Sequence, residues 1–351
     1  MKTILIFAFL IGIGCGENKE LNDKLFKAVM LGKKAETADC LNDGANVNAR
    51  DKDGVSPLYY AAQKGYLDIV KLLISRGARV KVKMAFDATP LHSAAYGGNV
   101  EIARIFIDKG SDIKARMKGK WLGGFTVLHM ATEKRRFEML RFLLSKGAEI
   151  NARDQSGMTP LHNAISSRDS RSAAFLIANG ADIHGKDNSG NSPLHDAATA
   201  GLTDIVLKLI EKGVALDMPD NSGFTPLMNA ASSGHLELVK IFISKKARLE
   251  TQTTGKYLYN QRAIHLAAYR GYNNIIELLV KSGAQTDPQD EKGRTALHIA
   301  VDRNYLKTVS LLLRLGAKVN IKNLKGQTAL DLTRWKKMRT LLLKYGAKSG
   351  K

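Results

Sequence analysis

Apolar residues follow a two-part pattern that recurs along most of this chain. Each copy has a short segment built around a pair of alanines. A glycine follows, and then a longer segment carries apolar residues at helical spacing, such as Ile205, Leu209 and Ile210. Residues spaced in this way lie on one face of a helix. The pattern therefore predicts pairs of short helices whose apolar faces pack on neighbouring pairs.

A short polar motif precedes each predicted helix pair and sets the period. Thr-Pro-Leu-His stands at residues 89–92 and 159–162. A threonine can cap a helix, and proline fits the first helical turn. Successive motifs start 33 residues apart, except that the steps from 89 to 126 and from 225 to 262 are 37 residues. Related forms start at Ser56, Thr126, Ser192, Thr225, Arg262 and Thr295.

This order of residues resembles the ankyrin repeat from about Asn18 to Ala347. The resemblance implies an all-α repeat solenoid of stacked helix-turn-helix units with β-hairpin loops, elongated and curved, with modified end units that face water. It implies a single array, 18–347, of about ten repeats. The expected units are 18–50 (N-terminal cap), 51–83, 84–116, 117–153, 154–186, 187–219, 220–252, 253–289, 290–322 and 323–347 (C-terminal cap).

The first residues carry a different pattern. Lys2 is followed by an apolar run from Ile4 to Ile13, which is shorter than the ~20 residues that span a bilayer as a helix. Residues 1–14 are expected to be a signal peptide. The small residues before Cys15 resemble a bacterial lipoprotein signal, in which the cysteine is lipidated; cleavage after Gly16 is the alternative. We expect an exported protein, periplasmic or anchored to a membrane as a lipoprotein, with secretion as a further alternative.

The histidines are the main candidates for catalysis or metal binding, but their positions in the repeat indicate a structural role. A residue three positions after the cap can bond back to that turn, and stacked repeats would arrange such residues as a ladder and not around one ion. We find no phosphate-binding loop or serine elbow. The expectation is a non-catalytic protein with no metal and no cofactor. Six of the eight histidines occupy this position: His92, His129, His162, His195, His265 and His298.

Charge adds a second hypothesis about partners. The chain has 54 Lys and Arg against 33 Asp and Glu, a formal net charge of +21. Such a surface attracts anions. The alternative function is therefore a basic electrostatic adaptor for anionic envelope polymers, lipids or nucleic acid, although the predicted signal peptide argues against nucleic acid. The two cysteines, Cys15 and Cys40, do not identify a compartment, and Cys40 is expected to be buried.

Binding residues are expected where the scaffold does not dictate the side chain, at the hairpin tips and at the exposed end of each first helix. Aromatic rings beside cations are typical of protein interfaces, although single tyrosines and lysines can also simply solvate a helix face. The tips contribute Phe86, Phe125 and Phe224, and the helix ends contribute Tyr96, Tyr269, Arg270, Arg303 and Trp335.

The two longer repeats add a third group of candidates. Their hairpins contain the same pattern, Gly-Lys-aromatic-Leu, at residues 119–122 and 255–258. We interpret Trp121, Tyr257 and Tyr259 as contact residues; the alternative is that these rings fold onto a neighbouring hairpin. The sequence thus predicts binding of another protein through a concave face and the hairpin tips, with a secreted effector acting on host proteins as a further alternative.

Overall fold

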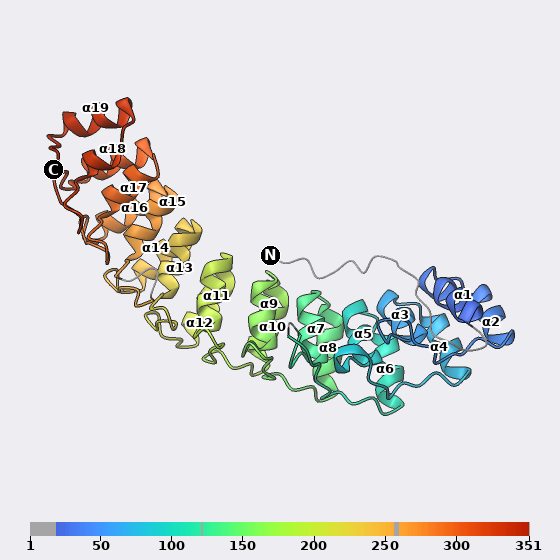
Figure 1. Cartoon of the computed structure of the whole chain (residues 1–351). Coiled ribbons are helices and arrows are strands. Elements are labelled where there is room, and N and C mark those ends of the chain that lie inside the picture. The colour runs from blue at the N-terminus through green and yellow to red at the C-terminus, as the bar shows by residue number, and fades with distance from the viewer. Residues whose placement is uncertain (1–18, 121, 256–259, 351) are drawn as a thin grey trace. The chain divides into compact units, whose positions relative to one another are not determined.

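The computed structural model describes residues 19–120, 122–255 and 260–350. It divides into two compact units, one ending at Ala181 and the other starting at Asp182. The signal peptide predicted at residues 1–14 and the lipidation candidate Cys15 lie outside the described residues. Figure 1 follows the helices of each unit in chain order.

In the first unit, short helices alternate between two rows, and each helix contacts the next one in its row. The alanine pair makes this close approach possible, because Ala94 and Ala95 are fully buried between neighbouring helices. The inner row holds α1 (Lys19–Met30), α3 (Pro57–Lys64), α5 (Pro90–Gly97), α7 (Val127–Glu133) and α9 (Pro160–Ser166), and the outer row holds α2 (Lys34–Asn42), α4 (Leu67–Ser75), α6 (Val100–Asp108), α8 (Phe137–Ser145) and α10 (Ser170–Ala178).

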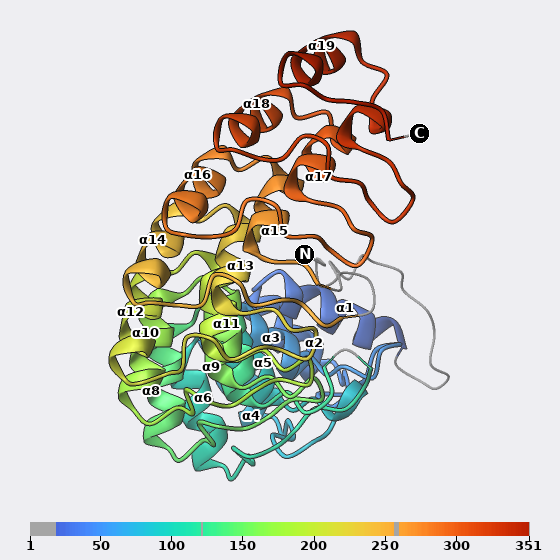
Figure 2. The same ribbon diagram turned by 90° about the vertical axis from the view of Figure 1, so that its left-hand side faces the viewer.

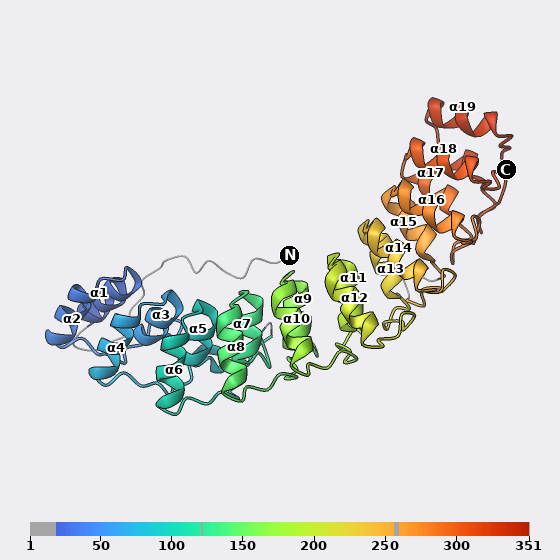
Figure 3. The same cartoon turned by 180° about the vertical axis from the view of Figure 1, so that it is seen from behind.

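The second unit has the same two rows, which stand apart clearly in Figure 2. Its last repeat replaces the inner α-helix by a short 3-10 helix, with α19 beyond it (Figure 3). The inner row holds α11 (Pro193–Ala200), α13 (Pro226–Ser233), α15 (Ala263–Arg270), α17 (Ala296–Asp302) and η2 (Ala329–Leu332), and the outer row holds α12 (Thr203–Glu211), α14 (Leu236–Ser244), α16 (Asn273–Lys281), α18 (Leu306–Arg314) and α19 (Lys336–Lys344).

Helix α5 illustrates how the motif starts and ends an inner helix. Thr89 is extended (φ −114°, ψ 161°), its Oγ1 accepts the His92 backbone N–H, and Pro90 occupies the first turn. Gly98 ends the helix in the left-handed conformation (φ 88°). Arg135 and Arg168 stand where other repeats have this glycine, and both adopt the same conformation with φ 54°. The backbone geometry is therefore kept even where the sequence departs from glycine.

The loops between repeats are tight turns. Asp51 Oδ1 accepts the backbone N–H groups of Asp53 and Val55 at 2.9 Å each, and Gly54 supplies the left-handed residue. Asp154, Asp187, Asp220 and Asp290 make the same pair of bonds. The predicted hairpin loops thus close through an aspartate side chain and backbone hydrogen bonds. None of the residues that the structure describes belongs to a β-strand. The predicted all-α repeat solenoid is confirmed.

Five of the six predicted ladder histidines link their own repeat to the following hairpin: His92, His129, His195, His265 and His298. In the first unit, His129 Nδ1 accepts the Thr126 backbone N–H at 3.2 Å, and its Nε2 lies 3.1 Å from the Met158 carbonyl oxygen of the following hairpin. This arrangement requires a neutral imidazole with the proton on Nε2. In the second unit, His265 joins Arg262 N–H to Pro288 in the same way, at 3.0 and 2.9 Å.

Replacing His265 by phenylalanine tests this link. His265→Phe keeps a ring but leaves the buried Arg262 N–H and Pro288 carbonyl without their imidazole partner, and we expect it to lower the free energy of unfolding by ~2–4 kcal/mol. Urea unfolding followed by circular dichroism measures the change. His184 is exposed and outside the ladder, so His184→Phe is the control. Equal destabilisation by both substitutions would contradict the assignment.

Candidate interaction surfaces

The structure places only part of the predicted contact set. Trp121, Tyr257 and Tyr259 lie outside the described residues, so their role stays a prediction. The remaining candidates fall into two groups. Phe86, Phe125 and Phe224 belong to hairpins, and the others belong to the ends of inner helices or to the connection that follows them.

Among the predicted aromatic residues that the structure describes, Phe86 is the most exposed, with 61% of its surface accessible. It lies in η1 (Ala85–Asp87), where Phe86 and Asp87 both have positive φ, 59° and 55°. The next hairpin holds this conformation, because Lys118 N–H donates to the Phe86 carbonyl oxygen at 2.7 Å and Lys118 Nζ lies 3.1 Å from the Asp87 carboxylate. The backbone conformation is unfavourable for residues with a side chain. The ring is nevertheless presented to solvent.

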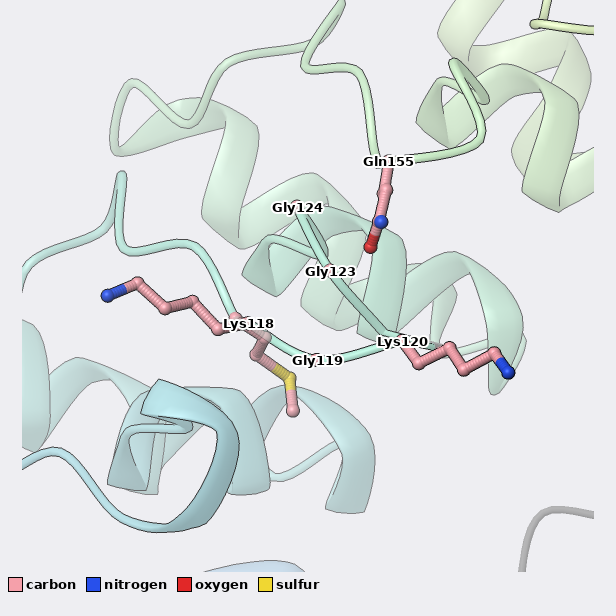
Figure 4. Close-up of a pocket in the computed structure, with 7 residues that line it drawn as sticks. Lys118, Gly119, Lys120, Gly123, Gly124 and Gln155 are labelled. Carbon is pink, nitrogen blue, oxygen red and sulfur yellow. The ribbon is translucent and has the colours of Figure 1, made fainter.

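A shallow hollow of about 550 Å³ lies in the neighbouring hairpin (Figure 4). Lys118 and Lys120 extend from its rim in opposite directions, while Gln155 reaches in from the next hairpin. The Gln155 backbone N–H donates to the Gly123 carbonyl oxygen at 2.7 Å. The two ammonium groups do not converge, so the hollow has no cation pair aimed at a bound anion. It is lined by Met117, Lys118, Gly119, Lys120, Gly123, Gly124 and Gln155.

Phe125 and Phe224 contribute to the scaffold more than to the surface. Both are half-buried, and the Phe125 ring lies 5.2 Å from the His129 ring between centroids. Their carbonyl oxygens lie opposite ladder histidines, Phe125 with His92 at 3.4 Å and Phe224 with His195 at 3.1 Å. Their backbones therefore serve the link between repeats.

A tyrosine at the end of an inner helix meets a cation of the next repeat in both units. In the first unit, Lys134 Nζ lies 4.6 Å from the centroid of Tyr96 and 3.2 Å from the Glu133 carboxylate. In the second, the Arg303 guanidinium carbon lies 4.1 Å from the Tyr269 centroid. Such cation–π contacts hold the cation over the ring.

The structure corrects the register predicted for Trp335. The sequence pattern aligns it with Tyr269, on an inner helix. The last inner element is only η2, and the chain is already extended at Thr333 (φ −129°, ψ 140°). Trp335 directly precedes α19, as Tyr305 directly precedes α18. The repeat is shortened within its inner helix, so Trp335 is equivalent to Tyr305. Its side chain is 41% exposed.

Leu324 is an exposed apolar residue that the sequence reasoning missed. It is 79% exposed at the tip of the last Asn-Leu-Lys-Gly turn, where its N–H donates to the Lys292 carbonyl oxygen at 3.0 Å. The signal was present in the repeat sequences, because most of the equivalent tips are polar, among them Lys52, Gln155, Asn188, Asn221 and Glu291, although unit 84–116 has Ala85 there. A leucine at this position is not required by the turn.

Asp196 is a second residue that the sequence reasoning missed. In repeat 51–83 of the first unit the equivalent residue is Tyr60, whose hydroxyl donates to Asp51 Oδ2 at 2.7 Å. Asp196 instead faces the equivalent turn with a carboxyl group, and its Oδ2 is buried with no hydrogen-bond partner among the described residues. Burial, and to a smaller extent the Asp187 carboxylate, raise the pKa of Asp196 to about 7.

This pKa gives a testable pH dependence. Between about pH 4 and 7 the folded chain keeps a proton on Asp196 that the unfolded chain has released, so the stability contributed at low pH is lost as the pH rises to about 7. Asp196→Asn should remove this loss and raise the free energy of unfolding above pH 7 by ~1–3 kcal/mol. Urea titrations across this pH range measure it. Glu211→Gln, on the exposed surface of the same repeat, is the control; identical profiles for both variants would disprove the assignment.

In residues 19–120, 122–255 and 260–350 no three or more His, Cys, Asp or Glu side chains form a group that could hold a metal ion, and the absence of a metal stays a prediction. No helix in these ranges is long and apolar enough to cross a membrane. Cys40 is a free thiol and is half-buried, so it is less buried than expected, because the outer helix of the first repeat lies at the edge of its unit.

Comparison with known proteins places these features in a family. The family described as ankyrin repeats (3 copies) matches residues 5–84, 25–117, 82–154, 116–187, 161–253 and 250–323. The chain is also 38% identical over 52 residues to the ankyrin repeat protein FPV223 of fowlpox virus (strain NVSL), which covers 15% of this chain and 37% of the viral protein. The family match extends over most of the chain, with the capped inner helices and aspartate turns described above. The chain belongs to the ankyrin-repeat family.

Proposed function

We propose that this chain is a non-catalytic binding module that recognises another protein through the ends of its inner helices and its hairpin tips. Ankyrin repeats are generally protein–protein interaction modules. The proposal rests mainly on one observation. The repeated polar residues already form hydrogen bonds within the scaffold, whereas Tyr269 and Arg303 are exposed and the scaffold does not require them.

The ladder histidines support this proposal over an enzymatic one. Burial lowers the pKa of His92, His129 and His265 to about 4. A general base needs a pKa near the working pH and access to a substrate. These imidazoles are buried, and both of their nitrogens already have partners within the scaffold. The most frequent candidate for acid–base chemistry in this chain is therefore used for structure.

The net charge of +21 supports a second candidate, a basic adaptor for anionic polymers or lipids. This candidate predicts binding distributed over the surface and a steep loss of affinity with salt. Several exposed cations are already paired with carboxylates, such as Arg104 with Glu101 and Arg141 with Glu138. We therefore place it behind recognition of a specific protein.

We further propose that the protein is exported, with Cys15 as the site of lipid attachment. The support is the sequence alone: Lys2, the apolar run from Ile4 to Ile13 and the small residues around Cys15. Mass spectrometry of the protein from its native cell tests both points. A mature N-terminus at lipidated Cys15 is expected; an unprocessed Met1 would contradict export, and an unmodified Glu17 would contradict lipidation.

Crosslinking in native envelope extract tests the proposed function. We expect one protein to be captured by the mature chain at physiological salt and to bind the purified chain saturably. The variant Trp121→Ala, Tyr257→Ala, Tyr259→Ala measures the contribution of the hairpin tips, and its capture should be reduced. An unrelated folded protein of equal net charge is the control. Recovery of the same anionic material by both proteins, removed by added salt, would favour the adaptor instead.

A further inference from the structure

The inner helices of the second unit end in two chemically different ways. Helix α11 ends with Thr199 and Ala200, and α13 ends with Ser232 and Ser233. These positions carry no ring and no charge. The next two inner helices end with an aromatic residue or with charge, at Tyr269 and Arg270 on α15 and at Asp302 on α17, which Arg303 follows directly. A possible recognition surface is therefore confined to two adjacent repeats.

Tyr269 organises the two cations of this surface. Its side chain is 45% exposed, and the guanidinium carbons of Arg303 and Arg270 lie 4.1 and 5.8 Å from its ring centroid. Because both distances refer to the same ring, the two guanidinium groups lie within about 10 Å of each other. A guanidinium held near a ring still presents its N–H edge to a carboxylate. We name Tyr269, Arg270 and Arg303 the arginine–tyrosine surface.

Neither arginine of this surface has an ion-pair partner within the described part of the chain. Asp302 is adjacent in sequence, yet it forms no ion pair with either arginine. The first unit provides a natural comparison, because Lys134 lies over Tyr96 in the same way but pairs with Glu133 at 3.2 Å. The two side chains of that pair are only 26% and 23% exposed. The same cation–π arrangement is thus satisfied internally in one unit and left available in the other.

We propose that the arginine–tyrosine surface docks an acidic segment of a partner protein, with carboxylates accepting from Arg270 and Arg303. This inference rests on the proposed protein-binding function and adds the chemistry and position of one contact. Side chains at positions i and i+2 of an extended chain lie on the same side, about 7 Å apart. Two such carboxylates match two guanidinium groups within about 10 Å of each other.

Protein carboxylates fit this surface better than phosphates of nucleic acid or lipid. Arg303 lies over the Tyr269 ring, so that face of the ring is not open to a stacked base. Base stacking is a main source of affinity in single-stranded nucleic acid binding. Asp302 directly precedes Arg303, in the repeat position that Tyr269 occupies on α15, and its carboxylate repels a uniform row of negative charge. A protein segment can place a neutral or basic residue opposite it.

Binding of a defined peptide tests the proposal. The probe is a short fluorescent peptide with glutamate at every second position, and its affinity is measured by anisotropy at physiological salt. Arg270→Gln with Arg303→Gln should weaken binding about tenfold or more, as expected for the loss of two charge-assisted contacts. Lys64→Gln with Lys134→Gln removes the same charge from the same repeat position in the first unit and should change affinity less than about twofold.

Two further measurements separate position from net charge. Tyr269→Leu keeps every charge but removes the ring, and it should weaken peptide binding about threefold if the ring positions Arg303. The peptide with glutamine in place of glutamate should not bind. Equal losses for the two double variants would overturn the proposal in favour of diffuse attraction. Displacement of the peptide by an oligonucleotide or by anionic vesicles, at lower concentration than the free peptide, would overturn the choice of partner.

Failure of this surface can be told apart from failure of the proposed function. A protein partner captured from native extract can be tested directly against Arg270→Gln with Arg303→Gln. Undiminished binding of that partner would refute the arginine–tyrosine surface and leave the protein-binding function intact. Absence of any saturable protein partner, together with salt-sensitive binding of anionic polymers by every variant, would refute the function itself.

Discussion

The bond from a ladder histidine to the following hairpin is the polar interaction that fixes the contact between neighbouring repeats where the histidine is present. Five histidines make it, whereas Tyr59 and Met228 stand in the histidine position of two other repeats. An isolated helix pair cannot bury its apolar face, so each repeat is stable only against a neighbour. Apolar packing alone does not fix which backbone groups meet across that contact. His129 does so in the first unit, where it accepts the cap N–H of Thr126 and donates to Met158. One side chain therefore completes a helix start and sets the position of the next repeat.

The structural roles of the repeated residues determine where binding residues can lie. The threonines, aspartates and histidines of the repeat are committed to caps, turns and links, and the alanines are committed to close packing. The residues left over are those whose position allows any side chain, at turn tips and helix ends. Phe86, Leu324, Tyr269 and Trp335 are large and exposed at such places. A repeat protein thus separates stability from recognition, and the identity of its partner depends on few residues.

Much of this structure could be predicted from the sequence, because the repeat gives many copies of the same evidence. Helix pairs, caps and the histidine ladder all follow from one period. The failures arose where a copy departs from the others. Trp335 was aligned with the wrong position because the last inner helix is shorter than the others, which the spacing of residues in the sequence does not show. Asp196 was overlooked because a single carboxylate in the sequence does not show that its Oδ2 is buried without a hydrogen-bond partner. The contact between Arg303 and Tyr269 could not be predicted from the sequence, because it depends on where the two side chains lie in space.

Nitrogen NMR of the histidine side chains across pH is the sharpest test of the histidine link between repeats, because it reports the tautomer and the charge of each imidazole in the folded chain. We expect His92, His129 and His265 to stay neutral with the proton on Nε2 from pH 7 to about pH 5, since burial lowers their pKa to about 4. Protonation of these imidazoles near pH 6.5 with the fold intact, or a proton on Nδ1, would contradict the link between repeats.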